Sequence, residues 1–133
     1  NRAHVRPLAE TELIKEIPCQ KQFMLVTGTA EREATFQKMK REAARKKGGT
    51  GSFFAFHGSG PDNWHGILHQ GLKNMSGSRY MSCGQAYGSG IYMADSLHVS
   101  LGYAGRGGCP PHWSMSRISG AAVIVAVCEV VDR

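Results

Sequence analysis

The order of apolar and polar positions along the chain predicts strands and helices that follow one another irregularly. Short apolar runs at Gln22–Thr27, Ser52–His57 and Ile91–Ala94 are typical of strands. Ala121–Val131 is a longer apolar run of β-type residues, and its continuous character predicts a buried central strand. Because these runs alternate with helical segments without a regular βαβ rhythm, the pattern predicts an α+β fold.

Four further segments have helical spacing or helix-capping residues. They are Leu8–Ile17, which Pro18 ends, a segment from Thr29 to Lys47, Asp62–Gln70 before Gly71, and a segment from Asp95 or Ser96 toward Tyr103. The segment after Thr29 begins with acidic residues and ends with basic ones, which predicts a helix of about 18 residues. Two segments rich in glycine, serine or proline, Lys73–Gly90 and Arg106–Ser119, are expected to be irregular.

Composition narrows the class of protein. The chain has 133 residues, enough for one domain, and its 41% of apolar residues excludes wholesale disorder. It has no run approaching the ~20 apolar residues of a membrane helix. An apolar signal region is also lacking at the N-terminus. Since the first residue is Asn1 rather than methionine, we expect an excised or incomplete piece.

The basic charge is concentrated in one predicted helix. Sixteen lysines and arginines against ten acidic residues give a net charge of +6. Most of it lies in residues 32–47, which hold Arg32, Lys38, Lys40, Arg41, Arg45, Lys46 and Lys47 against Glu33 and Glu42. Such a run can contact nucleic acid. A solvated helix face explains it more often, so nucleic acid remains a weaker alternative partner.

Cysteine and histidine spacings do not predict a metal site. The four cysteines are widely spaced and lack a C-x-x-C pair, so we expect reduced thiols and an intracellular location, cytoplasmic or nuclear. Cys109 and His112 have no second pair to complete four ligands. His65 and His69 are spaced as on one helix face, and a half-buried or solvated face is the expected reading.

Three local patterns carry candidate chemistry. In the first, His57-Gly58-Ser59 ends a strand and Asn63-Trp64 begins a helix, so a histidine, an open glycine backbone and a hydroxyl lie together. Taken alone, this pattern is better explained by a tight turn that happens to contain histidine. The next two patterns decide between these readings.

The second pattern is Tyr87-Gly88-Ser89-Gly90-Ile91-Tyr92-Met93-Ala94, and the third is Ser100-x-x-Tyr103. The second lacks the third glycine of a dinucleotide fingerprint and precedes a strand, which argues against a Rossmann turn. In the third, Ser100 and Tyr103 share one helix face. Two tyrosines and a serine in one pocket could enclose a flat ring and bind an amide, although each tyrosine alone reads as a core residue.

Together these patterns resemble, in order and spacing, the catalytic domain of the PARP-type ADP-ribosyltransferases, which have the diphtheria-toxin-like fold. The resemblance runs from about Gln22 to the C-terminus. It rests on Phe54-Ala-Phe-His57-Gly-Ser, Asn63-Trp-His-Gly-Ile-Leu, Gly71-Leu72, Tyr87–Ala94 and Ser100-x-x-Tyr103. The sequences at Gly71–Ser76 and Ser100–Tyr103 are most similar to the mono-ADP-ribosylating branch, in particular to members that lack the family's catalytic glutamate.

The resemblance implies NAD as the substrate and assigns the site residues. His57 would bind a ribose hydroxyl, while the Gly58 backbone and the Ser100 hydroxyl would hold the nicotinamide carboxamide. Tyr103 would stack on the nicotinamide ring, and Tyr92 would flank it; His57 and Tyr92 are the catalytic candidates. The wider NAD-binding set adds Ser59 and Asn63, expected toward the adenosine half, and Ala94. Loop 74–86 would cover the cofactor.

The implied reaction transfers ADP-ribose from NAD to a protein side chain and releases nicotinamide, without a metal. Nicotinamide already leaves from a cationic ring, so orientation could supply much of the acceleration. NAD and protein acceptors are the expected partners, and no membrane segment is expected. The first alternative is an inactive domain that binds NAD or ADP-ribose. The second is a small nucleic-acid module built on the basic helix.

The resemblance also predicts what this chain lacks. It implies mixed and antiparallel split sheets with short helices, whose final strands are missing here. We therefore expect residues 1–21 to be an N-terminal helix or linker and residues 22–133 to be a partial catalytic domain, inactive and poorly stable alone. The family's third catalytic residue lies on a later strand, so Glu129 is not assigned that role.

Overall fold

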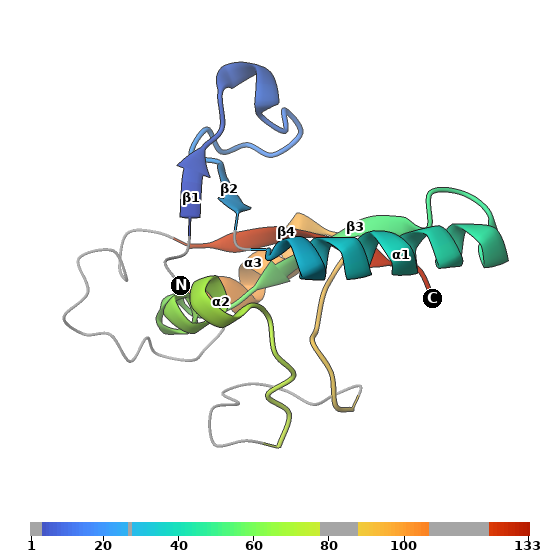
Figure 1. The fold of residues 1–133 in the computed structure, drawn as a ribbon. Helices are drawn as coiled ribbons and strands as arrows, with labels where there is room; N and C mark the ends of the chain where they lie inside the picture. Colours follow the sequence, from blue (N-terminus) through green and yellow to red (C-terminus); the bar gives the residue numbers. More distant parts are fainter. Residues whose placement is uncertain (1–3, 27, 78–87, 107–122) are drawn as a thin grey trace.

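The computed structural model describes residues 4–26, 28–77, 88–106 and 123–133, and the structural statements below refer to them. Two separate two-stranded antiparallel sheets combine with short helices, which confirms the predicted α+β class. Figure 1 shows the first sheet projecting from the remainder, while a long helix runs along the second. Among these residues, none of the helices combines the length and the apolar character needed to cross a membrane.

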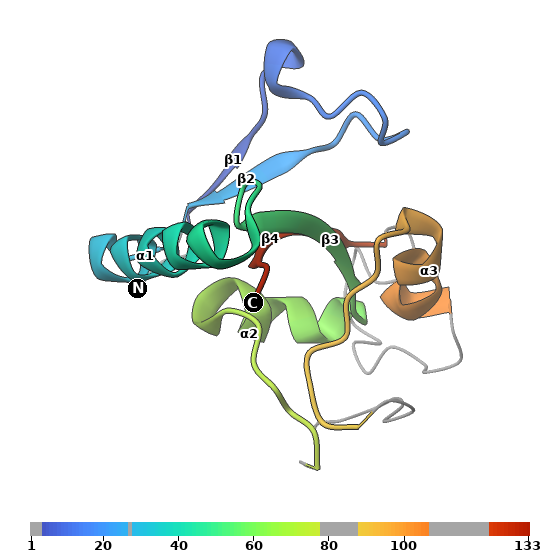
Figure 2. The same cartoon turned by 90° about the vertical axis from the view of Figure 1, so that its right-hand side faces the viewer.

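The projecting sheet is the hairpin of β1 (His4–Pro7) and β2 (Phe23–Val26), paired from His4 with Val26 to Pro7 with Phe23. The strand predicted at Gln22–Thr27 is thus confirmed in its central part. Figure 2 shows the same separation of the hairpin from the remainder after a quarter turn. The proposed boundary between residues 21 and 22 stays a prediction.

The helix predicted at Leu8–Ile17 is wrong, because the hairpin loop contains only a 3₁₀ turn at Glu10–Glu12. The Glu12 bond caps this short turn, whereas the Gln22 side chain takes the backbone groups of Ile14 that a longer helix would need. The Glu12 carboxylate accepts from the Ala9 N–H at 2.9 Å, and the Gln22 amide bonds both the N–H and the C=O of Ile14, each at 3.0 Å. Local side-chain bonds of this kind compete directly with helix formation.

The long helix α1 (Ala30–Lys47) forms as predicted, with the expected residues at its ends. The Thr29 hydroxyl accepts from the Arg32 N–H at 3.3 Å, and Gly48 ends the helix with a φ of 79°. The predicted apolar stripe faces inward, since Ala43 is buried and Phe36 and Met39 are half-buried.

The second sheet pairs β3 (Ser52–Gly58) with β4 (Val125–Val131), from Ser52 with Val131 to Gly58 with Val125. The predicted strand at Ser52–His57 is confirmed. The strand predicted at Ala121–Val131 is observed from Val125 onward, and residues 121–122 lie outside the described part. In the described part β4 pairs with β3 alone and Val127 is 40% exposed, so the expected buried central position is not observed among these residues.

The strand predicted at Ile91–Ala94 is also wrong. Ala94 alone forms a bridge, through two hydrogen bonds with Phe56 of 2.7 and 2.9 Å. The preceding residues are diverted because the Tyr92 hydroxyl donates to the Gly88 carbonyl at 2.6 Å. A side chain that bonds back to its own segment curls the chain away from an extended ladder.

Short helices complete the fold. A 3₁₀ turn at Pro61–Asn63 leads into α2 (Trp64–Gln70), which Gly71 ends as predicted. After Ser96, α3 (Leu97–Leu101) continues into a π-helical turn at Gly102–Arg106 that carries Tyr103. The predicted loops lack helix or strand at 73–77 and 88–90, and their other residues, except Arg106, lie outside the described part. The described core consists of Ala43, Ala55, Trp64 and Ala104.

Candidate active site

His57 lies near the end of β3 and is oriented by two contacts. Its Nδ1 atom is 2.8 Å from the Tyr92 carbonyl oxygen, and its ring meets Trp64 edge to face, with centroids 6.4 Å apart. Since a carbonyl oxygen only accepts, this bond requires the proton on Nδ1. The neutral imidazole then has Nε2 as its acceptor, the form suited to receive a hydrogen bond from a ribose hydroxyl.

Gly58 is where β3 and α3 meet backbone to backbone. A Cβ atom added to Gly58 would lie 1.9 Å from the Ser100 carbonyl oxygen, a distance that no side chain can occupy. From the sequence alone, the reason given for a glycine here was that a ligand can reach its backbone. The structure adds a packing reason, because only glycine allows α3 to approach the strand this closely.

Ser100 is the buried polar residue of this junction, with 3% of its surface exposed. Its hydroxyl donates to the Phe56 carbonyl at 3.0 Å, and the same carbonyl accepts from the Ala94 N–H at 2.9 Å. A serine hydroxyl has a single donor hydrogen, which is used here, so this hydroxyl can only accept a further hydrogen bond. That capacity fits the predicted bond to a carboxamide N–H.

The two tyrosines differ in how they are held. The Tyr92 backbone bonds His57 and its hydroxyl bonds Gly88, so both ends of this residue are engaged. Tyr103, in the π-helical turn, has 64% of its surface exposed. The structure therefore brings Tyr92 to His57, whereas stacking of a ligand ring on Tyr103 stays a prediction.

Ser59 and Asn63 organise the turn from β3 to α2. The Asn63 amide donates to the Ser59 hydroxyl at 2.9 Å, and the Trp64 indole N–H donates to the Ser59 carbonyl at 3.0 Å. Trp64, anchored in this way, presents its edge to His57. Both readings of this segment therefore apply, because a tight turn exists and it also positions the histidine.

Sequence reasoning missed a brace between residues 74–76 and 88–90. The Asn74 amide donates to the Ser89 hydroxyl at 3.1 Å, and the Ser76 hydroxyl accepts from the Gly90 N–H at 3.0 Å. A hollow of about 260 Å³ is lined by residues Gly88 to Met93, which include this second segment. The polar side chains of Asn74 and Ser76 were the only sequence signal for this brace, and their partners lie 15 and 14 residues away, respectively.

Glu129 is held away from this junction by a structural ion pair. Its carboxylate lies 2.5 Å from the Lys40 ammonium of α1 and accepts from the Ser52 hydroxyl at 2.6 Å. These two hydrogen bonds lower the pKa of Glu129. The same carboxylate therefore joins α1 to the β3–β4 sheet, and we assign it no catalytic role.

The described residues contain no group of three or more histidine, cysteine or acidic side chains placed to hold a metal ion. The His65 and His69 rings stack with centroids 4.4 Å apart, and His69 Nδ1 lies 2.8 Å from the His65 carbonyl. Cys109 and His112 lie outside the described part. A larger hollow of about 680 Å³ is lined by hairpin residues from Leu8 to Gln22, not by the site residues.

Comparison with known proteins identifies the family. The family described as Poly(ADP-ribose) polymerase catalytic domain matches residues 16–131. Protein mono-ADP-ribosyltransferase PARP8 of Mus musculus and of Homo sapiens is 39% identical over 105 residues, which are 79% of this chain and 12% of the relative.

Protein mono-ADP-ribosyltransferase PARP16 of Mus musculus is 34% identical over 87 residues, covering 65% of this chain and 24% of the relative. The chain thus spans a small part of the length of these relatives. The family match covers most of the chain, including every residue of the junction between β3, Ala94 and α3. The chain belongs to the poly(ADP-ribose) polymerase catalytic domain family.

Proposed function

We propose that this chain supplies the NAD-recognition part of a mono-ADP-ribosyltransferase site. The observation that carries the proposal is the convergence of three sequence motifs on the end of β3. His57 bonds Tyr92 at 2.8 Å and Ser100 bonds Phe56 at 3.0 Å, although these partners are 35 and 44 residues apart. This convergence supports the proposal that the three motifs form one binding site.

The chemistry follows from what these groups offer a pyridinium riboside. Nε2 of His57 accepts from a ribose hydroxyl, and the Ser100 hydroxyl accepts from the carboxamide, which fixes the sugar relative to its leaving group. The bond between ribose C1′ and the nicotinamide nitrogen breaks, and its electron pair leaves with neutral nicotinamide. An acceptor side chain then forms a bond to C1′ and loses its proton. Orientation of the reacting groups is the contribution of this part of the site.

Transfer of single ADP-ribose units is proposed because the similar relatives are named mono-ADP-ribosyltransferases. The acceptor is proposed to be a protein side chain. The resemblance of Gly71–Ser76 and Ser100–Tyr103 to family members that lack the catalytic glutamate supports the same product.

We further propose an intracellular location, cytoplasmic or nuclear. The two described cysteines, Cys19 and Cys128, are free thiols, and burial raises the pKa of the Cys128 thiol, which keeps it protonated. Microscopy of the tagged protein checks this location, and secretion into the medium would contradict it.

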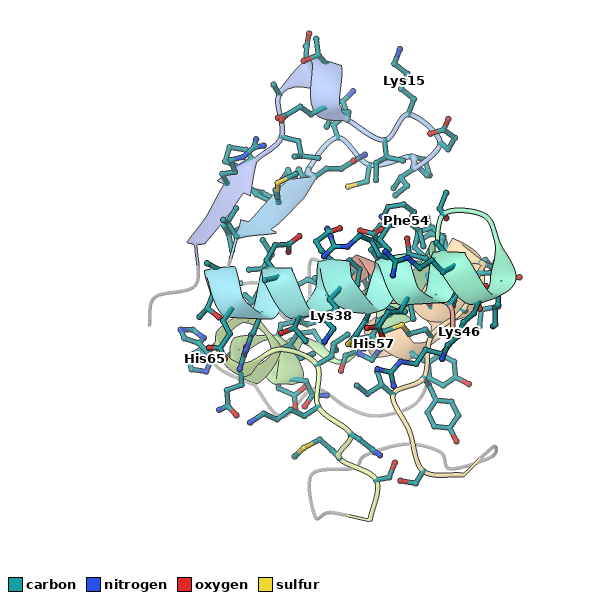
Figure 3. All side chains as sticks on the ribbon, turned by 45° about the vertical axis from the view of Figure 1, so that its right-hand side comes forward. Lys15, Lys38, Lys46, Phe54, His57 and His65 are labelled. Carbon is teal, nitrogen blue, oxygen red and sulfur yellow. The ribbon has the colours of Figure 1, made fainter. Side chains whose placement is uncertain are left out.

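The test of function uses the intact protein, NAD labelled on its adenine, and a protein extract. We expect label on protein and free nicotinamide, and we expect His57→Ala to lower transfer about 100-fold or more, in the range for a lost orienting group. The control is His65→Ala, an exposed histidine on α2, which should leave transfer unchanged (Figure 3).

Two results would contradict the proposal in different ways. Calorimetry that shows NAD binding without nicotinamide release would favour the inactive binding domain. Absence of both binding and transfer would reject the site itself.

A further inference from the structure

Helix α1 carries two sets of basic residues on different sides. Lys40 and Lys47 are seven residues apart and lie on one side, while Lys38, Arg41 and Arg45 follow the spacing of a second side. Two residues correspond to about 200° around a helix, so Lys38 and Lys40 point in nearly opposite directions. We call Lys38, Arg41 and Arg45 the outer basic face.

The inner set is neutralised within the fold. Lys40 pairs with Glu129 at 2.5 Å and Lys47 with Asp132 at 2.7 Å, so two cations fasten α1 to β4 and to the residue that follows it. Figure 3 labels Lys38, which belongs to the outer basic face. The three residues of the outer basic face are all exposed, and none of the ion pairs in the described part includes them.

No ion pair of the described part joins an acidic residue to the outer basic face. All ten acidic residues of the sequence belong to the described part, and Glu12, Glu129 and Asp132 are already paired. Glu42 lies within the face, four residues after Lys38 and three before Arg45, so the face keeps a net charge of +2. The charge on this side therefore serves no contact inside the described chain.

The surroundings of the face favour a nucleic acid over a protein or a membrane. Protein interfaces depend on aromatic or apolar anchors, and between Lys38 and Arg45 this side offers none. Membrane-surface helices need their apolar side free, whereas Ala43 of α1 is buried and Phe36 and Met39 are half-buried. Phosphate backbones are bound by lysine and arginine without apolar contact.

The spacing of the cations also matches a phosphate backbone. Lys38 and Arg45 are separated by about 10 Å along the helix axis at 1.5 Å per residue. A nucleic acid strand presents a phosphate about every 3.4 Å along its axis, so the face spans about three of them. Two of the three cations are arginines, whose planar fork can bond a phosphate with two N–H groups.

We propose that the outer basic face of α1 binds the phosphate backbone of a nucleic acid. The contact is independent of base sequence and lies on the side of α1 away from the β3–β4 sheet. It is separate from the NAD site and does not rest on the proposed transferase activity.

The test measures binding of the intact protein to a fluorescent single-stranded RNA of about 20 nucleotides and to a DNA duplex of the same length, at several salt concentrations. For three phosphate contacts, affinity should fall about 20-fold or more between 50 and 200 mM salt. In the variant with Lys38→Gln, Arg41→Gln and Arg45→Gln, the slope of log affinity against log salt should be smaller by about 2 to 3.

The matched control is the variant with Lys15→Gln, Lys21→Gln and Lys73→Gln, which removes the same charge from exposed sites outside α1. It should keep the slope of the unmodified protein. An equal loss in the control would overturn the proposal, because binding would then follow net charge alone.

Two other outcomes also overturn the proposal. Failure of the intact protein to bind either probe would do so, as would tighter binding of a poly-glutamate peptide than of RNA, which would assign the face to an acidic protein. If circular dichroism shows that the triple variant is unfolded, the single variant Lys38→Glu tests the proposal instead. A single reversed charge must weaken RNA binding measurably while leaving the thermal midpoint unchanged.

Discussion

The two antiparallel ladders of this chain are held in different ways. In the β1–β2 hairpin the side-chain bonds are local, since Arg6 pairs with Glu12 and Gln22 bonds Ile14. All four side chains of β2 are exposed. Around β3 and β4 the bonds join residues far apart in sequence, such as Lys40 with Glu129 and Ser100 with Phe56.

The difference locates the functional part of the molecule. Long-range bonds require that distant segments be ordered together, which costs more chain entropy than a local turn. Such long-range bonds hold Tyr92, Ala94 and Ser100 against β3. A substitution at this junction should therefore disturb both folding and NAD recognition, whereas one in the hairpin should affect the hairpin alone.

The largest effect is expected from Gly58→Ala. The new methyl group would lie 1.9 Å from the Ser100 carbonyl, so α3 must move away from β3. Strain of this kind costs about 3 kcal/mol. Urea unfolding of the intact protein should show the loss, and calorimetry should show weaker NAD binding.

The control for this change is Gly66→Ala in α2, where nothing lies within 4 Å of the added atom. It should raise stability by about 1 kcal/mol, the gain of alanine over glycine in a helix. Equal stability of the two variants would contradict the close backbone approach.

An intermediate effect is expected from Glu129→Gln, and it should depend on pH. Hydrogen bonds from Lys40 and Ser52 lower the pKa of Glu129 in the folded state. A lowered folded-state pKa stabilises the protein above the ordinary glutamate value of about 4.3, and the contribution is lost as pH falls through the lowered pKa.

Thermal midpoints measured from neutral pH downward should therefore fall more steeply for the unmodified protein than for Glu129→Gln. Glu16→Gln, which alters an exposed hairpin carboxylate, is the reference. Parallel curves for all three proteins would show that the ion pair does not contribute.

The smallest effect is expected from Glu12→Gln. Glu12 is exposed, and bonds from Arg6 and from the Ala9 N–H lower its pKa to about 2, so the pair persists through ordinary acid conditions. Exposed pairs contribute little to stability. Amide exchange should increase in residues 6–14 only, with ADP-ribose transfer unchanged. A loss of transfer like that of Gly58→Ala would show that the hairpin supports the site, and the comparison of the two ladders would fail.

The sequence predicted the parts of the candidate site that depend on local order. The His57-Gly58-Ser59 turn, the start of α2 and the position of Ser100 on a helix could all be placed from residue spacing. The brace from Asn74 and Ser76 to the segment at Ser89 could not, because asparagine and serine have many potential partners and only the folded chain selects them.

The sequence by itself determined α1, β3 and the order of the motifs, because caps, charge at helix ends and apolar periodicity act between near neighbours. The tertiary structure decided the rest. It replaced a predicted helix by a hairpin loop, left Ala94 as an isolated bridge, and used Lys40 and Lys47 to fasten α1 to Glu129 and Asp132. These outcomes depend on which distant groups meet, and pairwise contacts across 80 or more residues leave no periodic pattern in the sequence.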